Sequence, residues 1–245
     1  MFLPRQQPRL GLVDTDERRK LVNDVRRGLA QDGPVWTRGP ERDFETVTVP
    51  ERDCDLLRDL LIAERVERIV EIGLAYASSA LAIGEALATT ADPRHVIIDP
   101  FQTTGWSNVG WNLLCSAGLE PTTTLIEEWS SIVLPRMVNE GFVADAAFVD
   151  GSHRFHEVFL DLYFLRKIVR PGGLIITDDN WVPSIRAAAR YYELNLGWTA
   201  IPDAFAGGTM DPIGRDPDAE RVPRCRAFRL PDAVLEPPFL DFRPF

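Results

Sequence analysis

Residues 68–79, RIVEIGLAYASS, join a strand-length apolar run to a glycine turn and a helix start. Gly73 directly follows the run, and a residue without a side chain lets the backbone approach a neighbour closely. Ser78 and Ser79 then open a helix, whose first N–H groups have no partner within the helix. The stretch therefore predicts a strand, a tight loop and a helix that together can bind a ligand.

The alternation of a short apolar strand with a helix continues along the chain. Apolar runs of strand length occupy residues 68–72, 95–98, 123–126, 146–149 and 174–177, and helical stretches lie near 79–90, 109–117, 131–140, 155–169 and 184–196. Short apolar strands that alternate with helices predict a parallel sheet covered on both faces. Two more strands are expected at 198–201 and 224–230, separated by a Gly-, Pro- and Asp-rich loop at 204–220 that we expect to be mobile.

The first 50 residues differ from the rest and predict an N-terminal cap on a domain formed by residues 51–245. Acidic residues at its start favour a helix from about residue 14 to residue 30. Gly-Pro pairs at 33–34 and 39–40 break the chain, residues 46–49 predict a short extended piece, and an amphipathic helix follows Pro50.

The composition is that of a folded, acidic protein. The 245 residues are 45% hydrophobic and 26% charged, which is ordinary for a globular chain. A net charge of −10 disfavours a nucleic-acid partner, and no apolar run approaches the ~18 residues that cross a bilayer. The N-terminus lacks the pattern of a secretory signal, and Cys54, Cys115 and Cys225 form no CxxC pair. We therefore expect a cytoplasmic protein without a membrane partner, a disulfide framework or a thiolate zinc site.

Carboxylates follow each of the five predicted parallel strands, at Glu71, Asp99, Glu127 with Glu128, Asp150, and Asp178 with Asp179. Open α/β sheets bind ligands at the carboxyl ends of their strands, so this edge is the expected binding edge. Asp99 could accept both hydroxyls of a ribose, or it could be a turn residue before Pro100.

Asp150, Asp178 and Asp179 end two strands that a spacing of 28 residues, from 150 to 178, brings side by side. Three converging carboxylates repel one another unless a cation neutralises them. Oxygen ligands alone suit a hard ion such as Mg²⁺ or Mn²⁺. The alternative is that Asp150 caps a helix and that Asp179 is a turn residue before Asn180.

A family resemblance rests on three motifs together. EIGLAYASS at 71–79 is similar to E-x-G-x-x-x-G-x-S with Ala77 in place of the second glycine, and Asp150-Gly-Ser-His153 and RPGGLIITDDN at 170–180 follow it. The stretch 70–192 resembles a class I S-adenosylmethionine-dependent methyltransferase, most of all the metal-dependent small-molecule O-methyltransferases of the catechol O-methyltransferase-like and macrocin O-methyltransferase-like groups.

The resemblance implies a Rossmann-like, mostly parallel sheet of seven strands in the order 3-2-1-4-5-7-6, with the seventh strand antiparallel. It implies S-adenosyl-L-methionine as the cofactor, a small-molecule acceptor such as a natural product, sugar or catechol, and Mg²⁺ or Mn²⁺ held by Asp150, Asp178 and Asp179. The expected cofactor contacts are the methionine portion at Glu71 and Gly73, its carboxylate at Ser79, the ribose at Asp99, and the adenine at residues 127–130, which include Glu128 and Ser130. Ala77 and Asp150 are expected to contact the cofactor as well. A homo-oligomer is possible within this family.

His153 lies three residues after Asp150, and a neutral imidazole beside a metal could take the proton of the substrate hydroxyl. We therefore expect His153 and Asp150 to be the catalytic residues. His95 is interpreted as structural and His156 as a packing or supporting residue. Of the tryptophans, Trp106, Trp111 and Trp181 are expected beside the binding edge, and Trp129 is assigned to the core in preference to a stack on adenine.

Two other functions fit parts of the sequence. Tyr163 and Lys167 have the YxxxK spacing of short-chain dehydrogenases, with Ser152 upstream, as in an NAD(P)-dependent oxidoreductase. However, Ala75 and Ser78 replace glycines of the GxGxxG loop, and we interpret Tyr163 as part of an apolar helix face that packs on the sheet. Ala77 raises the second alternative, a non-catalytic binding module with a methyltransferase fold.

Overall fold

The computed structural model describes residues 15–34, 44–214 and 216–245. It confirms the predicted alternation of strands and helices. The parallel strands are β1 (Arg68–Ile72), β2 (Arg94–Ile98), β3 (Thr123–Ile126), β4 (Ala144–Val149) and β5 (Val169–Thr177). The helices between and after them are α4 (Ser78–Leu87), α5 (Val109–Ser116), α6 (Ser130–Asn139), α7 (Phe155–Ile168) and α8 (Pro183–Leu196).

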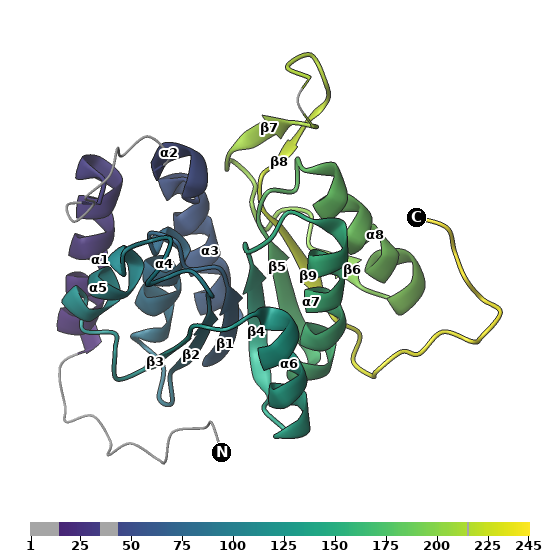
Figure 1. Ribbon diagram of the computed structural model, residues 1–245, viewed down its shortest axis with the longest axis horizontal. Coiled ribbons are helices and arrows are strands. Elements are labelled where there is room, and N and C mark those ends of the chain that lie inside the picture. The colour runs from purple at the N-terminus through teal and green to yellow at the C-terminus, as the bar shows by residue number, and fades with distance from the viewer. Residues whose placement is uncertain (1–14, 35–43, 215) are drawn as a thin grey trace.

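One seven-stranded sheet forms the centre of the molecule, with the order β3-β2-β1-β4-β5-β9-β6 (Figure 1). Strand β9 (Arg226–Arg229) lies antiparallel to β5, with Thr177 opposite Arg226, and β6 (Thr199–Ala200) completes the edge. The order and the single reversal of direction next to β5 are those expected from the resemblance. The reversal places the start of β9 beside the carboxyl end of β5, where the ligand edge lies.

Alternate residues of each strand serve the two faces of the sheet, because successive side chains point to opposite sides. Val70 and Ile72 of β1 lie in one core cluster with Leu162 of α7, whereas Ile69 lies in another with Ile83 of α4. Figure 1 accordingly shows α6, α7 and α8 on one side of the sheet and α3, α4 and α5 on the other. Both faces are covered, which explains why the strands are largely apolar.

The N-terminal helices pack on α4. Helix α1 (Thr15–Asp32) lies against α4 through the ion pair of Arg26 with Glu85, and α3 (Glu51–Ala63) follows Pro50 as predicted. The extended piece predicted at 46–49 is wrong at its start, because residues 44–47 form the short helix α2 (Phe44–Val47). Thr48 closes this turn by donating from N–H and Oγ to the Phe44 carbonyl. The Gly-Pro pair at 39–40 lies outside the described residues.

The loop expected at 204–220 contains strand β7 (Met210–Pro212), which pairs antiparallel with β8 (Arg221–Pro223) directly after the loop. The sequence did not predict this β7–β8 hairpin, and the mobility expected of the loop stays a prediction. Thr209 at the base of the hairpin donates its N–H to the buried carboxylate of Asp53 in α3, at 3.1 Å from Oδ1. Phe205 is buried in the core cluster that contains Leu57 of α3. A buried aspartate and a buried ring thus attach this segment to α3.

The C-terminal segment runs away from the sheet along α8 (Figure 1). The Asn195 side chain binds the backbone of Arg243 in both directions, as donor to its carbonyl at 3.0 Å and as acceptor from its N–H at 2.8 Å. Within the described part of the chain, no helix has the length and apolar character that crossing a membrane requires.

Candidate functional site

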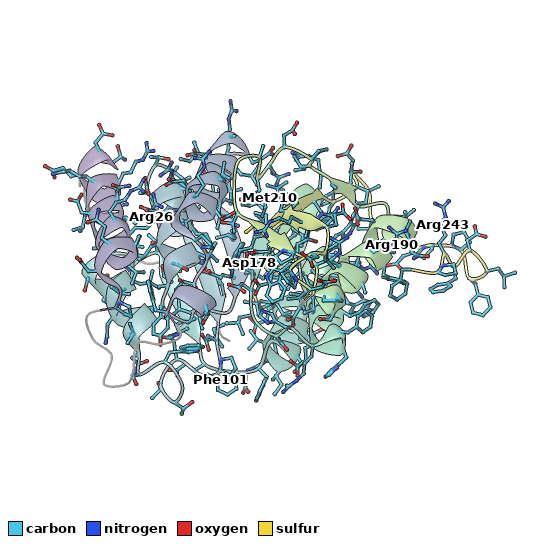
Figure 2. The ribbon with its side chains drawn as sticks, turned by 90° about the horizontal axis from the view of Figure 1, so that it is seen from above. Arg26, Phe101, Asp178, Arg190, Met210 and Arg243 are labelled. Atoms are coloured by element: carbon cyan, nitrogen blue, oxygen red, sulfur yellow. The ribbon has the colours of Figure 1, made fainter. Side chains whose placement is uncertain are left out.

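The carboxyl ends of β1, β2, β4 and β5 meet at one edge of the sheet, below the β7–β8 hairpin. Figure 2 looks onto this edge from above, with Asp178 near the centre of the molecule and Phe101 toward one side. Most of the site residues predicted from the sequence lie along this edge, and they divide into a loop region beside β1 and β2 and a charged cluster beside β4 and β5.

Gly73 joins these two regions. Its φ of +92° lies in a region that favours glycine, and a Cβ placed on it would lie only 2.1 Å from the carbonyl oxygen of Asp150. The first loop, which comprises residues 73–77 between β1 and α4, therefore packs directly on the backbone of Asp150 in the charged cluster. Ala77 at the start of α4 also has a positive φ of 65°, so the alanine that replaces the family's glycine adopts the backbone conformation that glycine prefers.

Glu71 is fully buried beneath the first loop, and its carboxylate faces inward. Its Oε1 accepts a hydrogen bond of 2.5 Å from the Ser79 hydroxyl, and its Oε2 lies 2.6 Å from Nε2 of the buried His95, in a contact without hydrogen-bond alignment. Glu71 and Ser79 therefore hold the loop between β1 and α4 in place. His95, interpreted as structural, belongs to this buried group.

Asp99 also shapes the first loop. Its Oδ2 accepts the N–H groups of Leu74 and Ala75, both at 3.0 Å, and its Oδ1 accepts the N–H of Phe101 at 2.8 Å. The carboxylate is 3% exposed. The turn function considered for Asp99 is therefore present, and the ribose contact stays a prediction that only the remaining lone pair of Oδ1 could satisfy.

Two exposed aromatic rings lie at the ends of β2 and β3. Phe101 and Trp129 are 46% and 47% exposed, and their rings meet edge to face with centroids 5.3 Å apart. The assignment of Trp129 to the core is wrong, because it is the N-cap residue of α6 and its ring lies outside the core. Glu128 accepts only the adjacent Trp129 N–H, at 3.1 Å, and it stays a predicted adenine contact together with Ser130.

The charged cluster contains Asp150, His153 and Asp179. One potential ligand atom from each lies within 4.8 Å of those of the other two, and Nε2 of the half-exposed His153 is 2.8 Å from Oδ2 of Asp179. Trp181 donates its Nε1–H to Oδ1 of Asp179 at 2.8 Å, which holds the carboxylate in a turn with a φ of 50°. Asp179 is thus both the predicted turn residue and a site residue, whereas the cap of α7 is Arg154 and not Asp150.

Asp178 is bound by a side chain that the sequence analysis did not single out. Arg224 donates Nε to both of its carboxylate oxygens at 3.1 Å and Nη2 to Oδ2 at 3.0 Å, and Cys225 Sγ lies 3.0 Å from Oδ1. Arg224 Nη2 also lies 3.2 Å from Oδ1 of Asp179. A lone arginine before a late strand carries no motif, so only the antiparallel position of β9 reveals this contact.

Burial and these contacts shift the pKa values of the clustered groups in different directions. Burial raises the pKa of Asp150, and the neighbouring charge of Asp178 adds to this effect. Burial acts in the same direction on Asp179, but the hydrogen bond from His153 and the charge of Arg224 outweigh it and lower its pKa. The same hydrogen bond to Asp179 raises the pKa of His153. The proton shared by this pair therefore resides mainly on the imidazole.

The donor set does not fit the metal site predicted at Asp150, Asp178 and Asp179. Both oxygens of Asp178 accept hydrogen bonds from the Arg224 guanidinium, which excludes a metal ion from the same lone pairs. Asp179 already accepts from Trp181 and contacts His153 and Arg224. We therefore assign the role of counter-ion for Asp178 to Arg224.

Several other predicted residues lie away from this cluster or have a different environment. Tyr163 is 37% exposed and accepts a hydrogen bond from Lys167 at 3.0 Å, so its assignment to the face packed on the sheet is wrong. His156 is an exposed surface residue and not a packing residue. Trp106 and Trp111 pack against the core cluster beside α4 and α5, while Trp181 alone of these three binds a site carboxylate.

Residues 70–180 match a family model described as a methyltransferase domain. This segment of the chain is therefore similar to a methyltransferase domain. Among solved structures, the chain is similar to the O-methyltransferase TomG from Streptomyces achromogenes, which is described as involved in tomaymycin synthesis and was solved in complex with SAM. The TM-score is 0.58 at 18% sequence identity, and the match covers 91% of this chain and 93% of TomG. The chain is also similar to an O-methyltransferase from Bacillus cereus in complex with SAH, with a TM-score of 0.55 at 16% identity, over 90% of this chain and 93% of that one.

No curated protein matches the sequence significantly. The structural similarities show the fold of the methyltransferase domain. The matched segment runs from Val70 in β1 to Asn180 after β5, and it therefore contains both the first loop and the charged cluster.

Proposed function

We propose that the methyltransferase domain transfers a methyl group from S-adenosyl-L-methionine to a hydroxyl group of a small molecule. The observation that carries this proposal is the contact of Gly73 with the Asp150 backbone. It joins the loop that would hold the methyl donor to a cluster of acids and a histidine. A donor bound at the loop therefore has its reacting end beside groups that can accept a proton.

On the donor side, the first loop would hold the cofactor through its backbone. Glu71, Ser79 and Asp99 are bonded within the protein and keep this backbone in place. The exposed pair of Phe101 and Trp129 offers an apolar surface to a flat base such as adenine. Two of the structural neighbours were solved with SAM or SAH, which supports this choice of cofactor.

On the acceptor side, bound S-adenosyl-L-methionine would supply the methyl group to the substrate oxygen, which would attack in line with the carbon–sulfur bond and release a neutral thioether. His153 would accept the proton of the hydroxyl group. Asp179 orients the imidazole and stabilises its charged form. The half-exposed position of His153 leaves it accessible to a substrate at this edge.

Three further predictions made from the sequence concern the acceptor, the location and the oligomeric state. A natural-product acceptor is supported by the description of TomG, and a cytoplasmic location and a homo-oligomer remain predictions. A divalent metal ion is not included, because Arg224 occupies Asp178. The oxidoreductase alternative lacks support, since Tyr163 and Lys167 lie on an exposed surface of α7.

Calorimetric titration of the full chain with SAH tests the proposal. We expect wild type to bind SAH and not NADH, and Gly73→Ala to lose binding because its methyl group would collide with Asp150. Gly141→Ala is the matched control: its φ of +69° carries the same kind of backbone strain, but nothing lies within 4 Å of the added Cβ. Binding of NADH in place of SAH, or equal SAH binding by the Gly73 variant, would contradict the proposal.

A further inference from the structure

Arg224 lies among the three carboxylates that end β4 and β5. Its guanidinium is 11% exposed and contacts both Asp178 and Asp179 through Nη2, at 3.0 Å and 3.2 Å. The two contacts come from one planar group, which binds a carboxylate with two parallel hydrogen bonds more specifically than an ammonium does.

The backbone around Arg224 is held equally firmly. Its N–H donates to the Thr209 carbonyl at 2.9 Å, and its carbonyl accepts the N–H of Asn180 at 2.8 Å. The Asn180 side chain also donates to the Pro223 carbonyl at 3.0 Å. The hairpin segment and the turn after β5 thus place the guanidinium in the cluster from both sides.

The charges of the cluster nearly balance without any ion. Asp150, Asp178 and Asp179 contribute up to three negative charges, Arg224 contributes one positive charge, and His153 adds another when protonated. A divalent cation bound to Asp179 would lie beside the guanidinium and be repelled by it. Three converging carboxylates need positive charge beside them. Arg224 and protonated His153 of the chain itself supply most of this charge.

We propose that Arg224 is the resident cation of this cluster: a positioning residue that takes the place of a divalent metal ion and makes methyl transfer independent of metal. The second part rests on the proposed function. The first part, that the cluster holds an arginine where it would otherwise hold a metal, stands on the geometry alone.

Titration of the purified full chain with Mn²⁺ alone, followed by the electron paramagnetic resonance of free Mn²⁺, tests the first part. Wild type should show no one-to-one site with a dissociation constant below about 1 mM. Arg224→Met removes the positive charge at similar length, and we expect it to bind Mn²⁺ at least about tenfold more tightly than wild type. Arg226→Met is the matched control, because Arg226 pairs with Glu193 outside the cluster, and it should behave as wild type.

A micromolar one-to-one Mn²⁺ site in wild type that Asp178→Asn abolishes would overturn the proposal. This measurement compares wild type with Asp178→Asn and needs no variant of Arg224. It therefore tests the proposal even if Arg224→Met does not fold. Arg224→Lys keeps the positive charge and should, like wild type, show no Mn²⁺ site. If the lysine variant bound Mn²⁺ as tightly as Arg224→Met does, that result would also contradict the proposal.

The second part is tested by turnover with and without EDTA, once an acceptor is identified from a panel of hydroxylated compounds. We expect less than about a twofold change in wild type, whereas loss of turnover in EDTA that Mg²⁺ restores would overturn metal independence. Failure of the proposed function would show differently, as the absence of SAH binding, while the Mn²⁺ titration would still report on Arg224.

Discussion

His153 and Asp179 form the only pair at the binding edge, among the described residues, in which an imidazole faces a carboxylate in the exposed part of the site. Nε2 and Oδ2 are 2.8 Å apart, and the acid is held in turn by Trp181. Asp150 lies in the same cluster, but burial raises its pKa and makes it a poor carrier of negative charge. At the scale of single residues, His153 is therefore the group that we propose as the proton acceptor.

His153→Ala should retain SAH binding and lose about 10²–10⁴ in turnover, the usual contribution of a positioned general base. His156→Ala is the control, because this histidine lies three residues further on and its side chain is 76% exposed beside Glu157. Turnover measured with an acceptor panel checks this. Equal rates for the two variants would remove His153 from the reaction.

Asp161 of α7 is a buried acid remote from the charged cluster. Burial raises the pKa of Asp161 to about 7, against a hydrogen bond with Ser130 that opposes the shift. The folded protein thus keeps this proton up to about pH 7, whereas the unfolded chain releases it near pH 4. The contribution of Asp161 to the free energy of unfolding is therefore present below about pH 4 and is lost as the pH rises through about 7.

Asp161→Asn cannot ionise, so it should be more stable than wild type at pH 8 by about 1–3 kcal/mol and nearly equal to it at pH 4. Urea unfolding at the two pH values measures the difference. Asp24→Asn, on the exposed surface of α1, should show no such dependence on pH. A stability difference that does not change between pH 4 and pH 8 would be inconsistent with a titrating Asp161.

At the scale of elements, the β7–β8 hairpin depends on α3. Asp53 in the first turn of α3 accepts the Thr209 N–H, and the N–H of Arg224 donates to the carbonyl of the same threonine. Gly208 must lack a side chain here, since a Cβ would lie 2.5 Å from Oδ1 of Asp53. One helix thereby fixes the segment that carries Arg224 into the site.

Asp53→Ala should free the hairpin, because the partly buried Thr209 N–H loses its acceptor, at a cost of about 1–3 kcal/mol. Hydrogen exchange of residues 204–224 should become faster, while the exchange of β1 and β4 stays slow. Asp59→Ala, on the exposed surface of the same helix, is the control. Unchanged exchange in the hairpin would show that its strands hold together without α3.

At the scale of the whole molecule, α1 is joined to α3 and α4 by a buried ion network. Arg26 and Glu85, both about 2% exposed, are 3.1 Å apart, and Arg26 also binds Asp55 of α3 at 2.7 Å. Figure 1 shows α1 on the outside of α4, far from the C-terminal segment on α8. The described part of the N-terminal region is thus packed on the domain, while its predicted boundary at residue 50 remains a prediction.

Arg26→Ala should lower the free energy of unfolding by about 3–5 kcal/mol, because Glu85 and Asp55 lose their buried partner. Arg27→Ala removes a neighbouring arginine that is 39% exposed and should cost less than about 1 kcal/mol. Urea unfolding followed by fluorescence and by circular dichroism should give coincident transitions. Separate transitions would mean that α1 and the sheet unfold independently.

The strand–helix alternation, the five parallel strands and the edge at which the acids gather can all be predicted from the sequence. These features follow from local apolar patterns and from turn residues such as Gly73, which act over a few neighbouring positions. The extended piece at 46–49 failed because Thr48 bonds back to Phe44, a contact that β propensity alone does not predict.

The contacts between charged residues at that edge depend on how the whole chain folds and cannot be predicted from local sequence. Arg224 lies 46 residues beyond Asp178, and the two are in contact because β9 enters the sheet antiparallel to β5. Likewise, Asp53 meets Thr209 across 156 residues, and His153 meets Asp179 through the crossing of α7. A sequence pattern records which residues are charged, but the neutralisation of a buried carboxylate depends on distances of a few ångströms, which are set by the packing of the whole chain.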